Sequence, residues 1–242
     1  MKKTFLKYGF PLLNLTLGRL VRLFQAFLIK PDFRQRADLL IELENQSILD
    51  SVTFAQSNFN TTVAFESRQE LWENIAPLVQ NSGLILEFGV WRGDSINNFA
   101  RLFPDRELHG FDSFHGLSEN WGGWRMAKGT FDEGGRLPKV AKNVKLHEGD
   151  FEISLPDFLA KHSESIDLLH LDADTYQPTS YVLNQIATRL RPGSVLIFDE
   201  FFGYPNWRNH EFKAFSECVL KFDLNYEFIA FTRMQVAVQI RK

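Results

Sequence analysis

Strand-like runs alternate with helical stretches across residues 84–200, and this alternation limits the fold more than any other feature of the sequence. The helical stretches have about 10–15 residues each, the length expected between the strands of βαβ units. A succession of such units predicts an α/β fold with a mostly parallel sheet. Two further runs, YEFIAFT and QVAVQIR, predict an antiparallel hairpin at the C-terminal end. The five strand-like runs span residues 84–90, 107–113, 144–150, 166–174 and 194–200.

Each of these five runs carries an acidic residue at or near its C-terminal end. In an open parallel α/β sheet, ligands bind in the crevice outside the carboxyl ends of the strands. Five acidic strand ends in series therefore predict a ligand rich in hydroxyl and amino groups, a metal ion, or both. The acids are Glu87, Asp112, Asp150, Asp172 with Asp174, and Asp199 with Glu200.

Length and composition agree with one α/β domain preceded by a helical extension. The 242 residues are 44% hydrophobic and 24% charged, which are ordinary values for a chain with a packed core. The net charge of −3 provides no basic field to displace counterions from phosphates, which argues against a nucleic-acid partner. Cys218 is the single cysteine, so no internal disulfide is expected and a reducing, cytoplasmic compartment is indicated. We place the extension at residues 1–66 and the domain at residues 67–242.

The first thirty residues are basic and apolar, and no acid precedes Asp32. Arg19 and Arg22 interrupt the apolar run, which is therefore too short and too charged to span a bilayer. No small-residue cleavage site typical of a signal peptide follows it. Two interpretations remain: an amphipathic helix at a membrane surface, or helices that pack on the domain as a substrate lid or homodimer contact. The basic residues are Lys2, Lys3, Lys7, Arg19, Arg22 and Lys30.

The segment EFGVWRGDS connects the first strand-like run to a helix. Gly89 lets the backbone approach a ligand closely, and Gly93 lets the turn close before the helix starts. The segment is not G-x-G-x-x-G, so it lacks the dinucleotide fingerprint. Free N–H groups at the start of the helix, beside Ser95, can still bind a carboxylate. The alternative is an ordinary tight turn between a strand and a helix.

Two further strand ends suit a nucleoside. Asp112 lies 23 residues beyond Gly89, where an acid can accept hydrogen bonds from both hydroxyls of a ribose; Ser113 follows it directly. Asp150 can bind an adenine amino group while Phe151 packs against the ring. Both acids also have simpler interpretations, Asp112 as a turn or N-cap residue and Asp150 as part of an ordinary Gly-Asp turn.

With these features in place, residues 67–242 resemble the class I S-adenosylmethionine-dependent methyltransferases. More narrowly, GFDSFHGLSENW and LHLDADTYQPTSYVLNQIATRLRPGSVLIFDE resemble the macrocin O-methyltransferase family, which includes sugar O-methyltransferases of antibiotic pathways. The resemblance implies a Rossmann-like sheet, S-adenosylmethionine as cofactor, and methyl transfer to a hydroxyl of a small molecule such as a sugar. It places Glu87 and Gly89 at the methionine end of the cofactor. Asp112 then binds the ribose, and Asp150 with Phe151 the adenine.

The resemblance also implies a divalent metal. Asp172 ends the fourth run, and Asp199 and Glu200 end the adjacent fifth, so the three carboxylates can converge on one point. Carboxylates combined with water ligands suit Mg²⁺. Members of the family usually carry Asp or Asn where this chain has Glu200, which is a departure at the third ligand. Without the resemblance, these acids would as often be solvated turn residues.

Methyl transfer requires a hydroxyl oxygen in line with the methyl group and a group that removes its proton. Asp172 and Asp174 are the leading candidates for this base, and His170 on the same strand is another. The alternative for His170 is a buried, hydrogen-bonded strand histidine. The glycine-bearing loop 114–143 is long enough to be a functional lid. Candidate acceptor contacts are His115, Trp121, Trp124, Arg125, Tyr176, Tyr204, Trp207, Arg208 and His210.

Two other functions stay open at this point. One is a metal-independent methyltransferase on another small-molecule nucleophile, in which Asp199 and Glu200 orient the substrate. The other is a non-catalytic module that binds a nucleotide or a membrane and retains the fold without turnover. Acids at the fourth and fifth strand ends argue against the second alternative, because a pure binder needs only the first three.

Overall fold

The computed structural model describes residues 38–241. The predictions for residues 1–30 therefore lie outside the described residues. Contacts divide the chain into two units, Met1–Leu43 and Glu44–Lys242, and the sheet with its covering helices belongs to the second. In the part of the chain that is described, no helix has the length and apolar character needed to cross a membrane.

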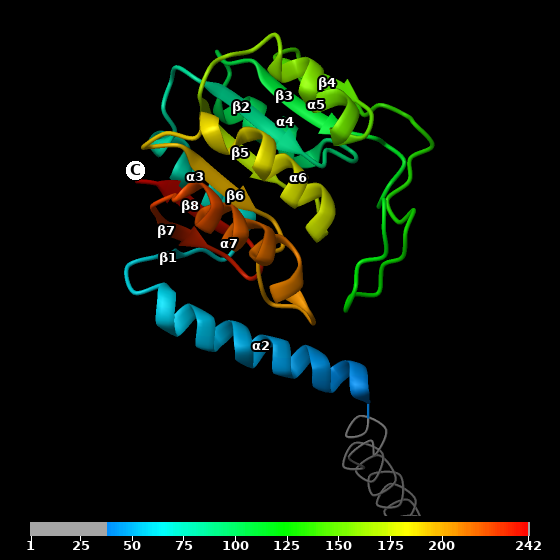
Figure 1. Ribbon diagram of the computed structural model, residues 1–242, viewed down its shortest axis with the longest axis vertical. Helices are drawn as coiled ribbons and strands as arrows, with labels where there is room; N and C mark the ends of the chain where they lie inside the picture. Colours follow the sequence, from blue (N-terminus) through cyan, green and yellow to red (C-terminus); the bar gives the residue numbers. More distant parts are fainter. Residues whose placement is uncertain (1–37, 242) are drawn as a thin grey trace, which may run out of the picture. The chain divides into compact units, whose positions relative to one another are not determined.

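The core of the fold is an eight-stranded sheet in the order β1-β7-β8-β6-β5-β2-β3-β4 (Figure 1). Strands β2 to β6 pair with one another in parallel, whereas β8 is antiparallel to both β6 and β7. The predicted α/β class with a C-terminal antiparallel hairpin is thus confirmed. The strands are β1 (Val63–Ala64), β2 (Leu84–Phe88), β3 (Leu108–Asp112), β4 (Val144–Glu148), β5 (Ile166–Leu171), β6 (Val195–Phe198), β7 (Tyr226–Phe231) and β8 (Val236–Ile240).

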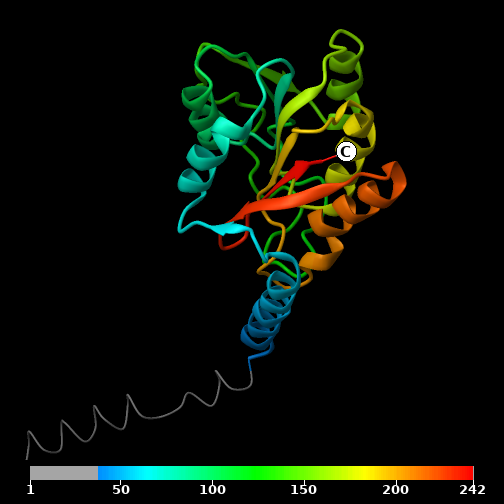
Figure 2. The same ribbon diagram turned by 90° about the vertical axis from the view of Figure 1, so that its left-hand side faces the viewer.

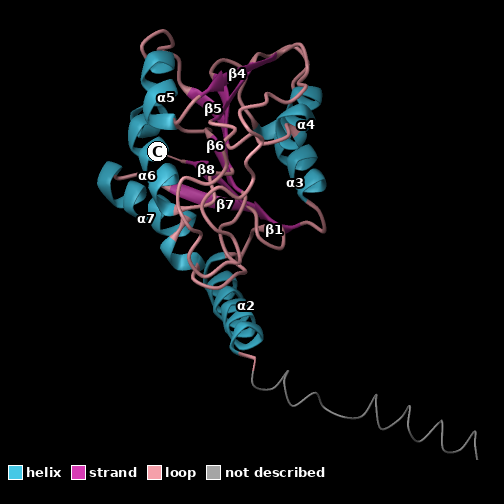
Figure 3. Ribbon diagram, turned by 90° about the vertical axis from the view of Figure 1, so that its right-hand side faces the viewer, coloured by secondary structure: helices cyan, strands magenta, loops and turns pink. Residues whose placement is uncertain are grey.

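Helices cover both faces of this sheet (Figure 3). One face packs against α3 and α4, and the other against α5, α6 and α7, each through a separate set of buried apolar side chains. Strands β2, β5 and β6 are buried along their whole length because both of their faces are covered. The helices are α3 (Arg68–Ile75), α4 (Asp94–Leu102), α5 (Phe151–Leu159), α6 (Tyr176–Ile186) and α7 (Glu211–Phe222).

The segment before the domain differs from its prediction. The sequence predicts one or two short helices in residues 31–66, but the structure has the 20-residue helix α2 (Leu39–Asn58) and then β1. Strand β1 pairs in parallel with β7 at the edge of the sheet (Figure 2). A two-residue strand has no alternation that could reveal it in the sequence.

The amino ends of the central strands are tied together by Asp167, which is fully buried. Its carboxylate accepts the backbone N–H groups of Ser82 and Gly83 at 2.8 and 2.6 Å and pairs with Arg106 and Arg191 at 3.0 and 2.7 Å. Burial by itself would raise the pKa of Asp167, but these donors hold it below its usual value. The network fixes the end of the sheet opposite to the predicted ligand site.

At the carboxyl ends, backbone hydrogen bonds continue one residue beyond the strands. Gly89 N–H donates to the carbonyl of Phe111, and Asp172 N–H donates to that of Phe88, both at 2.9 Å. Asp199 N–H donates to the carbonyl of Leu171, also at 2.9 Å. The sheet register therefore sets Gly89, Asp172 and Asp199 side by side at one edge.

Candidate functional site

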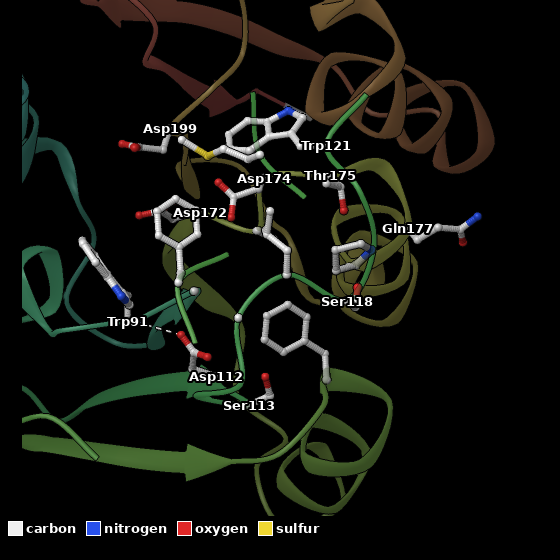
Figure 4. Close-up of a pocket in the computed structure, with 18 of the residues that line it drawn as sticks. Trp91, Asp112, Ser113, Ser118, Trp121, Asp172, Asp174, Thr175, Gln177 and Asp199 are labelled. Carbon is white, nitrogen blue, oxygen red and sulfur yellow. Dashed lines mark hydrogen bonds between the residues drawn. The ribbon is translucent and has the colours of Figure 1, made fainter. Parts of the chain in front are cut away.

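A cavity of about 890 Å³ opens at the carboxyl ends of the strands, within the usual size range of small-molecule sites. Figure 4 shows Asp112 and Ser113 at one end of it and Asp174, Asp199 and Trp121 at the other. Nine of the residues predicted to bind the cofactor or the metal or to act in catalysis line this cavity: Gly89, Asp112, Ser113, Asp150, Phe151, Asp172, Asp174, Asp199 and Glu200. Four lie outside its described lining: Glu87, Gly93, Ser95 and His170.

Gly89 brings the backbone after β2 close to the backbone after β5. Its φ of +91° lies in the region that L-residues avoid. A Cβ atom at this position would lie 1.8 Å from the carbonyl oxygen of Asp172. Only glycine lets the turn after β2 approach the segment after β5 this closely. Gly93, by contrast, closes the turn as the N-cap of α4, with φ of +82°.

Asp112 shapes the surrounding loops as well as lining the cavity. Its Oδ2 accepts the backbone N–H groups of Val90 and Trp91 at 2.8 and 2.7 Å, and its Oδ1 accepts that of Phe114 at 2.7 Å. A carboxylate can accept about four hydrogen bonds, so Oδ1 keeps capacity for a ligand hydroxyl. Ser113 beside it accepts the N–H of His115 at 3.2 Å.

A buried polar chain runs beneath the cavity. Ser95 Oγ donates to Glu87 Oε1 at 2.9 Å, and Glu87 Oε2 lies 3.0 Å from His170 Nδ1. On its other side, His170 Nε2 lies 3.8 Å from Asp199 Oδ1. Burial lowers the pKa of His170, but the Asp199 and Glu87 carboxylates outweigh it and raise this pKa to about 10. His170 is thus an imidazolium between two acids, which matches the alternative interpretation given for it.

The remaining acids form two groups on the cavity wall, which share Asp172 and place Asp199 and Glu200 in different groups. Carboxylate oxygens of Asp172, Asp174 and Glu200 lie within 4.8 Å of one another, as do ligand atoms of His170, Asp172 and Asp199. Burial and then the Asp199 charge raise the pKa of Asp172 well above its ordinary value, and the same two causes act on Glu200. Such crowding is relieved only by a proton or a cation.

The unpaired atoms in this cluster allow a test of the implied metal. Asp199 Oδ1 and Glu200 Oε2 are buried without a hydrogen-bond partner among the described residues. Buried carboxylate oxygens with no donor are costly, and hard oxygen ligands of this kind are those that Mg²⁺ takes. The residues present therefore fit a divalent cation.

One acid of the cluster escaped the sequence analysis. Glu211, the first residue of α7, is completely buried, and its Oε2 accepts the backbone N–H of Glu200 at 3.2 Å. Burial, followed by the Asp172 charge, raises the pKa of Glu211 well above its ordinary value. An acid in the first turn of a helix is common because it complements the helix dipole, so the sequence offered no distinguishing signal.

The predicted acceptor contacts separate into two groups. His115, Trp121 and Trp124 line the cavity. The other side chains do not line it: Tyr176 donates to Glu217 at 2.6 Å, Arg125 pairs with Glu44, Arg208 pairs with Asp50, and Tyr204, Trp207 and His210 are buried.

Comparisons with known proteins agree with this geometry. A family model described as "Methyltransferase domain" matches residues 86–201. The solved structure of CalS11, a calicheamicin methyltransferase, is 23% identical with a TM-score of 0.56, covering 90% of each chain. That of the O-methyltransferase NovP has the same identity and TM-score, over 72% of this chain and 80% of its own. An apo structure of CalS11, described as a TDP-rhamnose 3'-O-methyltransferase, has a TM-score of 0.51 at 22% identity, covering 90% of this chain and 91% of its own. No curated protein matched.

The likeness to these structures establishes the fold, and the domain match concerns residues 86–201. The matched residues 86–201 include the turn after β2 and every acidic strand end from Glu87 to Glu200. The fold places those strand ends, apart from the buried Glu87, around one cavity. Residues 86–201 thus match a methyltransferase domain, which agrees with the resemblance of the sequence to the class I S-adenosylmethionine-dependent methyltransferases.

Proposed function

We propose that the protein transfers the methyl group of S-adenosylmethionine to a hydroxyl of a small molecule, a glycosyl group in particular, with Mg²⁺ assistance. The observation that carries this proposal is a single cavity with nucleoside-type contacts at one end and a buried acid cluster at the other. The names of the similar structures, a TDP-rhamnose 3'-O-methyltransferase and an O-methyltransferase, support a hydroxyl acceptor.

In this proposal the cofactor occupies the end near Asp112. One ribose hydroxyl donates to Asp112 Oδ1 and the other contacts Ser113, while Asp150 and Phe151 hold the adenine. Phe151 is anchored for this role because its ring packs edge-on against Phe88, with 5.2 Å between centroids. Gly89 leaves room for the methionine end, which directs the sulfonium methyl toward the acids.

The metal would be held by Asp172, Asp199 and Glu200. When bound, Mg²⁺ stabilises the developing alkoxide and lowers the pKa of the acceptor hydroxyl. The longer side chain of Glu200 is compatible with this role because its Oε2 is buried with no donor among the described residues. The imidazolium of His170 keeps Asp199 ionised and oriented from below.

Asp174 is the residue best placed as the base. It lines the cavity, and its backbone has a φ of +64°, a strained conformation of the kind that clusters at functional sites. Burial and then the Glu211 charge raise its pKa well above the ordinary value, which brings it closer to neutral pH, where a general base is most effective. The acceptor O–H proton passes to Asp174, the oxygen bonds to the methyl carbon, and the S–C bond breaks to release S-adenosylhomocysteine.

A metal-independent methyltransferase is the second candidate, and one observation favours it. His170 already gives Asp199 a cationic partner without any metal ion. In that case Asp199 and Glu200 orient the acceptor by hydrogen bonding, and Asp174 remains the base. Chelation separates the two candidates. Turnover that survives in EDTA excludes the Mg²⁺-assisted reaction and leaves the metal-independent reaction.

The proposal is tested with methyl-labelled S-adenosylmethionine and a panel of glycosides and nucleoside diphosphate sugars. Asp174→Asn should lower turnover by about 10²–10⁴-fold, the usual contribution of a general base, while calorimetric binding of S-adenosylhomocysteine is unchanged. Asp112→Ala should abolish that binding. Full turnover in Asp174→Asn, or unchanged binding in Asp112→Ala, would contradict the assigned roles.

A further inference from the structure

The long loop 114–143 is folded back on itself as a hairpin. Leu117 exchanges backbone hydrogen bonds with Thr130 and Gly129, each at 2.9 Å, and Trp121 N–H donates to the carbonyl of Met126 at 3.0 Å. These bonds put Gly122 and Gly123 at the tip of the hairpin. A loop of this length therefore has a defined tip with a defined neighbour.

The tip docks on the turn that follows β6. The carbonyl oxygen of Gly122 accepts hydrogen bonds from Asn206 Nδ2 at 3.0 Å and from His210 Nε2 at 2.8 Å. Gly123 has a φ of +90°, and a Cβ there would lie 2.4 Å from the carbonyl oxygen of Pro205. Backbone thus packs directly on backbone, which any side chain at Gly123 would prevent.

Docking builds one wall of the cavity from two separate segments. Trp121, which is 3% exposed, and Trp124 flank the docked tip, and both line the cavity. Their rings meet the buried ring of Tyr204 edge-on, at centroid distances of 5.7 and 5.2 Å. Figure 4 shows Trp121 at the same end of the cavity as Asp174 and Asp199. The aromatic wall formed by Trp121 and Trp124 therefore lies at the end of the cavity that holds Asp174 and Asp199, away from Asp112.

We infer that Asn206 and His210 are positioning residues for the methyl acceptor: by holding Gly122 they set the Trp121–Trp124 wall against which the acceptor ring packs. The face of an indole suits the apolar face of a ring-shaped acceptor such as a sugar. The role of these residues in positioning the acceptor rests on the proposed function, whereas the docking of the loop tip does not. Arg125 adds only an exposed ion pair with Glu44 at 2.9 Å, which contributes little.

Gly123→Ala is the direct test, because it pushes the tip away from Pro205. Gly134→Ala is the matched control, since Gly134 lies in the same loop with φ of +64° and no described atom lies within 4 Å of its added Cβ. Asn206→Gly removes one donor while tolerating the left-handed backbone of that residue, φ +68°. His210→Leu removes the other, and His210→Gln restores an N–H group at a similar position.

The first measurement needs no acceptor. Trypsin cleavage after Arg125 and Lys128 reports undocking, because cleavage follows the population of the open form. Trypsin should cleave Gly123→Ala and Asn206→Gly about tenfold faster than the wild type. It should cleave Gly134→Ala and His210→Gln at the wild-type rate. If trypsin cleaves Gly123→Ala and the wild type at equal rates, the loop tip is not docked on the turn after β6.

The second measurement separates the dock from its role. The acceptor KM should rise about tenfold in Gly123→Ala and His210→Leu, as expected when binding contacts are lost, while S-adenosylhomocysteine affinity stays at the wild-type value. Faster cleavage with an unchanged acceptor KM would overturn the positioning role. If no acceptor in the panel is methylated, the proposed function fails, and the cleavage rates still decide whether the tip is docked.

Discussion

Replacing Gly89 by alanine tests whether the two ends of the cavity depend on one backbone contact. The added Cβ would lie 1.8 Å from the carbonyl oxygen of Asp172 and 2.7 Å from its carbonyl carbon. Neither neighbour is a flexible side chain, so the clash cannot be relieved by a rotamer change. The turn after β2 and the segment after β5 must separate by about 1.6 Å to reach an ordinary contact distance of 3.4 Å.

Two terms set the size of the effect. A left-handed backbone conformation costs a non-glycine residue about 1–2 kcal/mol, and overpacking a close contact adds about 1–3 kcal/mol. For a chain of this size, each kcal/mol lowers the Tm by about 2–4 °C, so Gly89→Ala should lower it by about 10 °C. A displacement of about 1 Å at a reacting centre costs about 100-fold in rate, and we expect at least that loss in kcat/KM.

Gly129→Ala is the matched control for this experiment. Its φ of +83° resembles that of Gly89, but no described atom lies within 4 Å of the added Cβ. The variant therefore shares the conformational strain and lacks the clash. Thermal unfolding, calorimetry with S-adenosylhomocysteine and methyl transfer are measured on both variants. Equal losses in the two would refute the reasoning, because strain alone would then account for the effect of Gly89→Ala.

Two further predictions concern stability. Burial, and then the charge of His147, lower the pKa of His109 to about 4, below its ordinary value of 6.5. The folded protein therefore has its full stability with respect to His109 above pH 6.5 and loses stability as the pH falls toward 4. Urea unfolding should show up to about 3 kcal/mol less stability at pH 4 from this group, and His109→Gln should reduce that acid sensitivity; an identical pH profile would contradict it. Asp167→Asn should lower the unfolding free energy by about 3–5 kcal/mol, because Arg106 and Arg191 lose their buried partner, and a loss below 1 kcal/mol would show that the network is not cooperative.

Much of the sheet could be predicted because its central strands are buried on both faces. Such strands appear in sequence as continuous apolar runs, and β2, β5 and β6 were found from LILEF, IDLLHL and VLIF. Ser67 caps α3 by accepting the N–H of Glu70 at 3.2 Å, and a serine followed three residues later by a glutamate is the sequence pattern of such a helix start. The acids beyond the strands were predictable for a related reason, since parallel strands end at the same edge.

The same double burial hides the direction of side chains within a strand. Where one face is solvated, alternation tells which residues point inward, but β2 and β5 are buried at every position. The sequence therefore could not show that Glu87 and His170 point beneath the cavity toward each other. Residues just beyond the strands, Gly89 and Asp172, escape this ambiguity because strand register alone fixes their place at the edge.

The position of Glu87 and His170 links the two ends of the site through side chains as well as backbone. The backbone of Gly89, after β2, contacts the backbone of Asp172, after β5. The side-chain chain Glu87–His170–Asp199 joins β2, β5 and the end of β6. A buried imidazolium between two carboxylates is costly to break, because removing one charge leaves another unpaired. Strands β2, β5 and β6 are thus held at a fixed separation, which the proposed in-line methyl transfer would require. In that proposal these strands contribute rigidity rather than a mobile catalytic group.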